Sequence, residues 1–287
     1  MLAQLSQHPN LPILVGAPHI RLALPEGIEP GMEKPRRLSA YLFFFIIEGA
    51  SRHNIDMKEV RLESGQVLFV RPNQVHQILS DWKTVRDWYK IAFDEHCLTF
   101  LPQSFDFLVN PLNQPVVSLT REDQERLASI FGSLAQLLAG GRTHSTDLVL
   151  AHLNVLLAEL NDGYFRTTRT TTANGAAWEL YLAFTRLVDR DFATQPTVSG
   201  LARILAVSET RLYSVVRQFS GVSPKTFLLD RTMLEAQRIF YYDHPPVKEV
   251  AYQLGFSDPD HFSRLFRSRT GKTVTRFLND LRDLSGK

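Results

Sequence analysis

Two short segments near the C-terminus place side chains that can contact DNA bases or phosphates on one face of a helix. In residues 209–219 the apolar side chains recur at helical spacing, which leaves a polar face of Thr210, Arg211, Ser214, Arg217 and Gln218. In residues 259–269 the same spacing leaves Asp260, His261, Ser263, Arg264 and Arg267. Arginine can form two hydrogen bonds to a guanine edge, and aspartate can accept one from the cytosine amino group. Arg217 and Arg267 stand late in their helices, where we expect them to hold phosphates.

The elements that must position these side chains form an internal repeat. Residues 201–208 match residues 250–257, residues 212–217 match residues 262–267, and Gly221 matches Gly271. Each copy predicts a short helix, a tight turn and a second helix, which is the pattern of a helix-turn-helix. One copy alone would leave a helical bundle without a ligand as an equal alternative. Two copies in register favour DNA binding, with the second helix of each copy in the major groove.

Each position of the repeat has a physical requirement. Small Ala202 and Ala251 let the two helices of a copy cross closely, and Val207 and Phe256 bring each turn into the core. Gly255 supplies a left-handed turn conformation that other residues resist. The next helix needs a side chain that accepts from its first N–H groups, and the candidates are Ser208 in the first copy and Ser257 or Asp258 in the second.

The distribution of charge agrees with this interpretation. The whole chain of 287 residues has a net charge of +2. Residues 177–287 contain 16 Lys and Arg and 12 Asp and Glu, a net charge of +4, so residues 1–176 have a net charge of −2. A basic second half indicates a polyanionic partner, although four charges are few for a DNA-binding domain. We therefore expect both helix-turn-helix units, and two chains, to bind the same DNA.

Several segments match one known family. They are residues 205–208, 216–224, 250–258 and 261–267, followed by Thr270 and Gly271. On these segments, residues 197–282 resemble the DNA-binding domain of the AraC/XylS family of bacterial transcription regulators. The resemblance implies helix-turn-helix units at about 197–219 and 247–270, joined by a long helix from about Pro224 to Tyr242. It also implies that Arg264 lies where similar proteins contact DNA, with Ser214 as its counterpart in the first unit.

The sequence departs from the family pattern at three places. Ala206 stands where the first turn would have glycine, so either it adopts a left-handed conformation at a cost of about 1 kcal/mol or the turn differs slightly. Pro245 and Pro246 replace the polar cap before the helix at Val247, which a first helical turn tolerates. Val274 stands where the family generally has proline. None of these positions lies on the predicted DNA face.

The first half changes from strand to helix along its length. Residues 38–94 predict short antiparallel strands at 40–48, 53–62, 66–70, 75–79 and 85–93. Residues 65–76 resemble the cupin-type segment of the family's sensor domains, which implies a β-barrel that can hold one small ligand. We expect alternate residues of 41–47, with Trp82, Trp88 or Tyr89, to line it. Helices are predicted at about 121–139 and 145–160, and their apolar stripes either cover the β domain or form a dimer face.

Composition and residue counts exclude other classes. The single cysteine, Cys97, excludes an internal disulfide and a cysteine-built zinc site, and we interpret it as an ordinary thiol. No apolar run reaches the roughly 18 residues of a membrane helix, and no signal peptide precedes the first domain, so a cytoplasmic protein is expected. Among the histidines, His53 and His76 have no His-x-His partner, which argues against a metal, a cofactor or an enzymatic activity.

These patterns predict an α+β protein of two domains. Residues 1–165 form a cupin-like antiparallel β-barrel with two packing helices for effector binding and dimerisation, residues 166–176 a linker, and residues 177–287 an all-α DNA-binding domain. The predicted function is sequence-specific transcription regulation, as an activator controlled by a small-molecule effector. The expected partners are double-stranded promoter DNA, a second copy of the chain and RNA polymerase. The alternatives are a regulator whose first domain only dimerises or binds a protein, and a cupin enzyme with a helical appendage.

Overall fold

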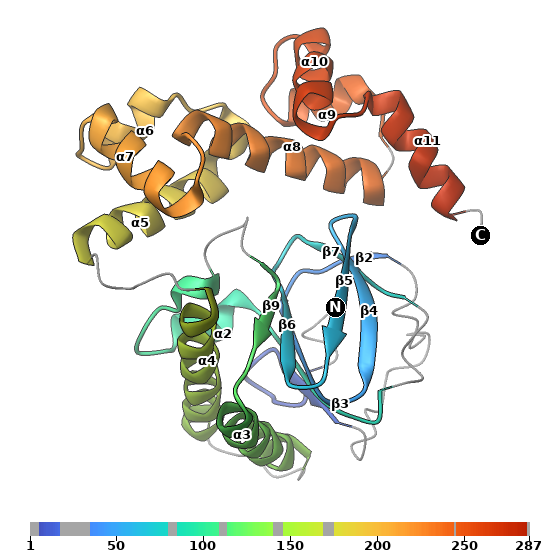
Figure 1. Cartoon of the computed structure of the whole chain (residues 1–287), viewed down its shortest axis with the longest axis vertical. Coiled ribbons are helices and arrows are strands. Elements are labelled where there is room, and N and C mark those ends of the chain that lie inside the picture. Colours follow the sequence, from blue (N-terminus) through green and yellow to red (C-terminus); the bar gives the residue numbers. More distant parts are fainter. Residues whose placement is uncertain are drawn as a thin grey trace. The chain divides into compact units, whose positions relative to one another are not determined.

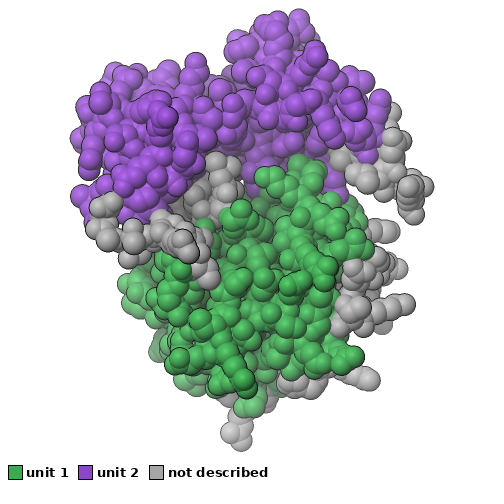
Figure 2. All heavy atoms as spheres, in the orientation of Figure 1, with its two compact units in different colours: residues 1–108, 113–170 green, residues 109–112, 171–287 purple. Residues whose placement is uncertain are grey.

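The chain folds into two compact units. A computed structural model describes residues 6–17, 35–79, 85–108, 114–139, 146–168, 175–243 and 245–285. Unit 1 comprises residues 1–108 and 113–170, and unit 2 comprises residues 109–112 and 171–287 (Figure 2). Unit 1 contains the sheets and unit 2 is helical in its described residues, which confirms the predicted α+β class (Figure 1).

Unit 1 is built on two antiparallel sheets. The first has the order β1 (Ile13–Gly16), β8 (Asp87–Phe93), β3 (Tyr41–Glu48), β6 (Gln66–Val70) and β9 (Val116–Ser118). The second has the order β2 (Arg36–Arg37), β7 (Val75–Ile78), β4 (Ala50–Ile55) and β5 (Lys58–Glu63). One cluster of buried apolar side chains joins the two, with Phe44 and Leu68 from the first sheet and Ile55 and Leu62 from the second. The sheets therefore pack face to face.

The segment predicted as one strand at 53–62 is instead a hairpin. β4 ends at Ile55, β5 begins at Lys58, and the two residues between them have φ of 48° at Asp56 and 65° at Met57. Two consecutive positive φ angles define the tight turn that suits the twist of a hairpin. The Asp56 carboxylate stabilises this turn, because it accepts hydrogen bonds from the Val75 N–H (3.0 Å) and the Gln74 side chain (2.8 Å). The missed turn signal was a single aspartate inside an alternating pattern.

β3 is buried on both of its faces, which explains why its sequence does not alternate. Leu42, Phe44 and Ile46 face the second sheet. Tyr41, Phe43 and Phe45 face the opposite way, into a larger core that includes the helices of unit 1. A strand covered on both sides has apolar residues at every position.

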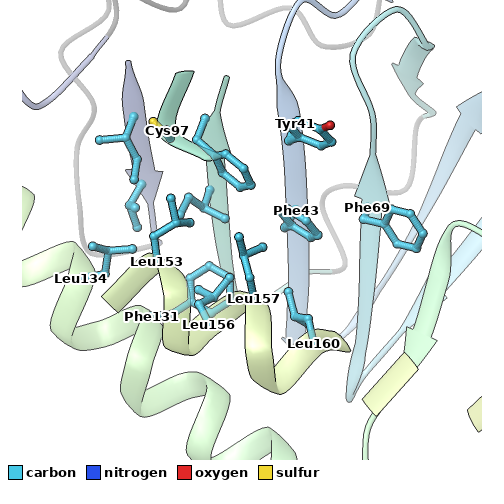
Figure 3. Close-up of a cluster of buried hydrophobic side chains, with 14 of the residues drawn as sticks. Tyr41, Phe43, Phe69, Cys97, Phe131, Leu134, Leu153, Leu156, Leu157 and Leu160 are labelled. Atoms are coloured by element: carbon cyan, nitrogen blue, oxygen red, sulfur yellow. The ribbon is translucent and has the colours of Figure 1, made fainter. Parts of the chain in front are cut away.

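Two long helices cover the outer face of the first sheet. They are α3 (Arg121–Ala139) and α4 (Thr146–Thr168). Phe131 of α3 stacks on Phe45 with a ring separation of 6.2 Å. Figure 3 shows the leucines of α4 in the same cluster as Phe131 of α3 and as Phe43 and Phe69 of the strands. The apolar stripes of both helices are therefore used inside the unit.

Two shorter elements complete unit 1. They are α2 (Glu95–Thr99), which carries the buried Cys97, and the 3-10 turn η2 (Asp106–Leu108).

The helix predicted at about 145–160 is longer than predicted, and its end reaches into the predicted linker at 166–176. α4 continues past Leu160 to Thr168, α5 begins at Gly175, and residues 169–174 lie outside the described part of the chain. Tyr164 explains the extension, because its ring packs within 6.1 Å of both Phe69 and Phe107 and is only 6% exposed. Burial of an aromatic ring outweighs the weak helix propensity of the neighbouring glycine and threonines. The boundary of 166–176 remains a prediction.

Unit 2 contains the repeat in the predicted order. Its elements are α5 (Gly175–Asp191), η3 (Phe192–Thr194), α6 (Val198–Ile204), α7 (Glu209–Ser220), α8 (Pro224–Tyr242), α9 (Val247–Gln253), α10 (Pro259–Thr270) and α11 (Val274–Ser285). The pairs α6–α7 and α9–α10 are the two helix-turn-helix units, and α8 joins them (Figure 1). Ala202 and Ala251 are buried at the helix crossings, as predicted.

Candidate DNA interface and ligand site

The turn of each helix-turn-helix unit has left-handed backbone where the repeat predicts it. Ala206 has φ 54° and its counterpart Gly255 has φ 79°. The first turn therefore keeps the family geometry with an alanine, at a cost of about 1–2 kcal/mol for an L-residue in this conformation. Since Ala206 is exposed, its methyl group adds little packing in return.

Polar side chains cap both recognition helices. Ser208 Oγ accepts a hydrogen bond from the Arg211 N–H at 3.1 Å, and so begins α7. Of the two candidates in the second unit, Asp258 is the cap, since its carboxylate accepts from the Asp260 N–H at 2.9 Å. Both helices end at a left-handed glycine, Gly221 in one and Gly271 in the other. The recognition helices thus start and stop at matching positions.

All the predicted DNA-contacting side chains are exposed. α7 buries Leu212, Val215 and Val216 and leaves Thr210, Arg211, Ser214, Arg217 and Gln218 at the surface. α10 buries Phe262 and Phe266 and leaves Asp260, His261, Arg264 and Arg267 at the surface. Ser263 is the exception within the predicted polar face: it is half-buried, and its hydroxyl donates to the Pro259 carbonyl at 2.9 Å.

Two of these side chains have protein contacts of their own. Arg264 Nη2 lies 3.6 Å from an Asp258 carboxylate oxygen, and both side chains are more than half exposed. A pair so open to water contributes little free energy, so the guanidinium stays available to another acceptor. The His261 ring meets Phe256 edge to face at 6.0 Å, which gives this histidine a packing role in the second turn.

Sequence reasoning missed Tyr213. It is 45% exposed and lies three residues after Thr210 and four before Arg217, so it shares their face of α7. Its position between Leu212 and Ser214, off the buried stripe, is the signal that identifies it.

An ion pair links α5 to the connecting helix α8. Arg231 of α8 donates to Asp189 of α5 at 2.7 Å and to Glu235 at 3.1 Å, and its guanidinium stacks 4.1 Å from the Phe192 ring. Arg238 donates to the same Glu235 at 3.1 Å. The residue before Arg231 on α8, Asp230, pairs with Arg269 of α10. Arg269 is therefore engaged by a carboxylate within unit 2, whereas Arg264 has only the open pair with Asp258.

The space between the two sheets of unit 1 contains polar side chains. Ser51 Oγ lies 2.7 Å from His53 Nε2, and His53 Nδ1 lies 2.9 Å from His76 Nε2. Burial lowers the pKa of His53 to about 4 and, together with the nearby His53, the pKa of His76 to about 3. Both rings are therefore neutral at pH 7. Within the described ranges, no three His, Cys, Asp or Glu side chains are arranged to hold a metal ion.

The aromatic residues predicted to line the barrel, Trp82, Trp88 and Tyr89, do not all face its interior. Trp88 faces the second sheet, and its ring stacks on Phe44 at 5.7 Å. Tyr89 faces the opposite way and stacks on Phe131 of α3 at 5.3 Å, so its assignment to the barrel interior is wrong. Trp82 lies outside the described residues. Alternation along β8 decides the direction, since neighbouring residues of a strand point to opposite faces.

Comparison with known proteins matches both units. Residues 22–154 match the family described as AraC-like ligand binding domain, and residues 201–280 match a helix-turn-helix domain family. The arabinose operon regulatory protein of Escherichia coli K12 is 21% identical over 86% of this chain and 82% of its own length. The HTH-type transcriptional activator RhaS of Citrobacter koseri is 25% identical over 85% of this chain and 88% of its own.

Solved structures also align with the chain. The crystal structure of ToxT from Vibrio cholerae covers 94% of this chain and 98% of its own, at 12% identity and a TM-score of 0.43. None of the described helices has both the length and the hydropathy to cross a membrane.

Proposed function

The chain belongs to the AraC/XylS family of DNA-binding transcription regulators, and from this premise we propose that α7 and α10 bind promoter DNA under the control of a ligand in unit 1. The observation that carries the proposal is the pair of exposed, polar recognition helices in one unit, combined with a match of the other unit to AraC-like ligand binding domains. The DNA-binding domain is residues 177–287, and we propose no catalytic activity and no cofactor.

The two recognition helices have different tasks. On α10, Arg264 and Asp260 contact base edges and Arg267 holds a phosphate. On α7, Arg217 holds a phosphate, and Thr210, Arg211 and Ser214 contact bases or the neighbouring backbone. His261 stays close to Phe256 and contributes shape to the second turn. The second helix-turn-helix unit supplies more charge at the bases, and the first helix-turn-helix unit supplies more shape recognition.

Ligand binding controls DNA binding through a shift of populations. The effector binds between the sheets of unit 1 and favours one arrangement of the two units about the segment 166–176. That arrangement selects one DNA-bound state and allows contact with RNA polymerase, so the chain acts as an activator. Such a regulator works where the promoter is, in the cytoplasm.

The active species is a homodimer that assembles through α4. Its inner face is buried in unit 1, yet Leu148 is 42% exposed and Val155 is 47% exposed. These two residues and the exposed Ala151 recur at helical spacing and form an outer apolar stripe. A second copy of α4 presents the same stripe, which a two-fold axis would bring into contact.

The test is selection of preferred DNA sites from a random library with the full-length chain. The proposal expects an enriched site with two recognition segments about one helical turn apart, repeated for the two chains. A library without any enriched sequence would contradict DNA recognition. If a sequence is enriched but pools of metabolites never change the DNA affinity or the thermal stability of the chain, unit 1 serves dimerisation alone.

A further inference from the structure

The residue that caps the second recognition helix also contacts an arginine proposed to bind a base. Asp258 precedes α10 and uses its two carboxylate oxygens differently. Its Oδ1 accepts a hydrogen bond from the Asp260 N–H at 2.9 Å, and its Oδ2 lies 3.6 Å from Nη2 of Arg264. Helical side chains point back toward the N-terminus, so the long Arg264 side chain reaches the cap. One carboxylate therefore joins the start of α10 to the tip of the Arg264 side chain.

The two helix-turn-helix units differ at both of these positions together. Ser208 and Asp258 occupy the same place, directly before their recognition helices, and Ser214 of α7 matches Arg264 of α10. The first unit thus combines a neutral cap with a serine, and the second combines a carboxylate with an arginine. Ser208 caps α7 through its hydroxyl, so a recognition helix can begin without a charge. The carboxylate of Asp258 is therefore more than a cap requires, and it occurs where an arginine is within its reach.

A second carboxylate on the same helix leaves this contact to Asp258. Asp260 stands four residues before Arg264, the spacing at which an acid and an arginine commonly pair on a helix. Among the described residues, Arg264 pairs with Asp258 and not with Asp260. The Asp260 side chain is exposed, so it stays available to the cytosine amino group. The two acids at the start of α10 therefore have separate contacts, one with the arginine and one with solvent or DNA.

The pair between Asp258 and Arg264 becomes stronger when DNA covers it. In the free protein 71% of the Arg264 side chain and 52% of the Asp258 side chain are exposed, so water screens the two charges. A base edge against Arg264 excludes part of this water, and the same two charges then interact in a medium of lower dielectric constant. The contact involves Nη2 alone. The remaining donors of the guanidinium can still form two parallel hydrogen bonds to a guanine edge.

From this arrangement we infer that Asp258 is a positioning residue for base recognition, whose carboxylate holds the Arg264 guanidinium in the orientation that bonds to guanine. Without this contact the flexible arginine side chain would divide its time between the base edge and nearby phosphates, which carry no sequence information. Asp258 acts through Arg264 and does not itself contact DNA. The inference rests on the proposed DNA binding of α10 and names the residue that makes Arg264 selective.

A double-mutant cycle in the full-length protein tests this role. Asp258→Asn removes the charge and keeps a side chain that caps helices as well as aspartate does. We expect it to weaken binding to the selected DNA site about fivefold, the fold-change of an ion pair worth about 1 kcal/mol, without weakening binding to random-sequence DNA. In the Arg264→Ala background the same substitution should have no further effect. Glu249→Gln, at an exposed acid of α9, controls for the removed charge and should keep the base preference.

Site selection and thermal unfolding separate positioning from capping. Asp258→Asn, and Asp258→Ser with the cap of the first unit, should both relax the preference at the base pair that Arg264 contacts and keep the melting temperature of the parent. Asp258→Ala also lacks the cap, so its melting temperature should fall.

Three outcomes would overturn the inference: an unchanged base preference in Asp258→Asn, an equal loss on selected and random DNA, or additive losses in the double variant. The proposed base contact itself is tested by Arg264→Ala. If that single substitution changes neither affinity nor preference, the proposed role of α10 is rejected. If it changes both while Asp258→Asn changes neither, only the positioning role is rejected.

Discussion

The side-chain amide of Gln195 donates a 2.8 Å hydrogen bond to the carbonyl oxygen of Leu254. Gln195 follows η3, just before the first helix-turn-helix unit, and Leu254 ends α9 in the turn of the second. Beside this bond, a Cβ added to Gly255 would overlap the carbonyl oxygen of Ala193. The segment that leads into the first helix-turn-helix unit therefore contacts the turn of the second unit directly, in addition to the covalent link through α8.

Replacement of Gln195 by alanine should weaken that link. Loss of one partly buried hydrogen bond costs about 0.5–1.5 kcal/mol, and we expect this loss at a full DNA site but not at a site that carries the sequence for one unit only. Gel-shift titrations on the two sites measure the difference. Gln253→Ala, at an exposed glutamine of α9, is the control. An equal loss on both sites would show that Gln195 does not coordinate the units.

The two turns should respond in opposite directions to exchange of glycine and alanine. Ala206→Gly relieves the left-handed strain of an exposed residue, and should raise the free energy of unfolding by up to about 1 kcal/mol. Gly255→Ala adds the same strain and also the overlap with Ala193, and should lower the free energy of unfolding by more than about 2 kcal/mol. Urea unfolding of the full-length proteins measures both. If Gly255→Ala left the free energy of unfolding unchanged, the close approach of Gly255 to the Ala193 carbonyl would be contradicted.

Arginines 264 and 217 should differ in the kind of DNA binding they support. Arg264→Ala should weaken binding to the selected site by about 1–3 kcal/mol and relax the preference at one base pair. Arg217→Ala should weaken binding to all sequences and reduce the slope of log affinity against log salt by about one unit. Arg121→Ala, on the exposed surface of α3 in unit 1, should change neither quantity. A changed sequence preference in Arg217→Ala would assign it to a base instead.

The buried histidine pair should make unit 1 sensitive to acid. In the native state the pKa values of His53 and His76 are about 4 and about 3, whereas in the unfolded chain both are near the usual value of about 6.5. The unfolded state therefore takes up protons first as pH falls, and stability present above pH 6.5 is lost progressively toward pH 4. By pH 5 the loss should be on the order of 2 kcal/mol per histidine.

Urea unfolding between pH 7.5 and 5, followed by tryptophan fluorescence, measures this dependence. His76→Gln keeps a neutral polar side chain and should flatten the profile. His152→Gln, at a partly exposed histidine of α4, is the control and should leave the profile unchanged. A parent protein whose stability does not fall over this range would rule out a neutral buried pair.

A charge on the outer stripe of α4 should separate the proposed dimer. Val155→Asp places a carboxylate in an apolar contact, where burial without a partner is costly, so the chain should sediment as a monomer. Binding to a full DNA site should weaken, while unfolding of the chain should change little because Val155 is 47% exposed. Lys58→Gln on β5, an exposed position, lowers the net charge by the same one unit and is the control. A dimer that persists in Val155→Asp would place the interface elsewhere.

The sequence alone determined the helix-turn-helix units and their outward residues. Leu212, Val215 and Val216 recur at a spacing that is a property of one helix, and the second copy repeats it with Phe262, Leu265 and Phe266. The left-handed turn at Gly255 is equally local, since it depends on the conformational freedom of one residue. Patterns of this kind need no knowledge of distant parts of the chain, which explains why the resemblance to a family was carried by this region.

The tertiary structure decided what local patterns leave open. The run from Tyr41 to Ile47 is apolar at every position, so only its packing between a sheet and two helices assigns Phe44 to one face and Phe43 to the other. The same pairing of distant strands turns Lys90 inward and brings His53 to His76. Tyr164 extends α4 through contacts with residues far away in the sequence. Strand pairing and core packing join residues that no local spacing relates, such as His53 and His76.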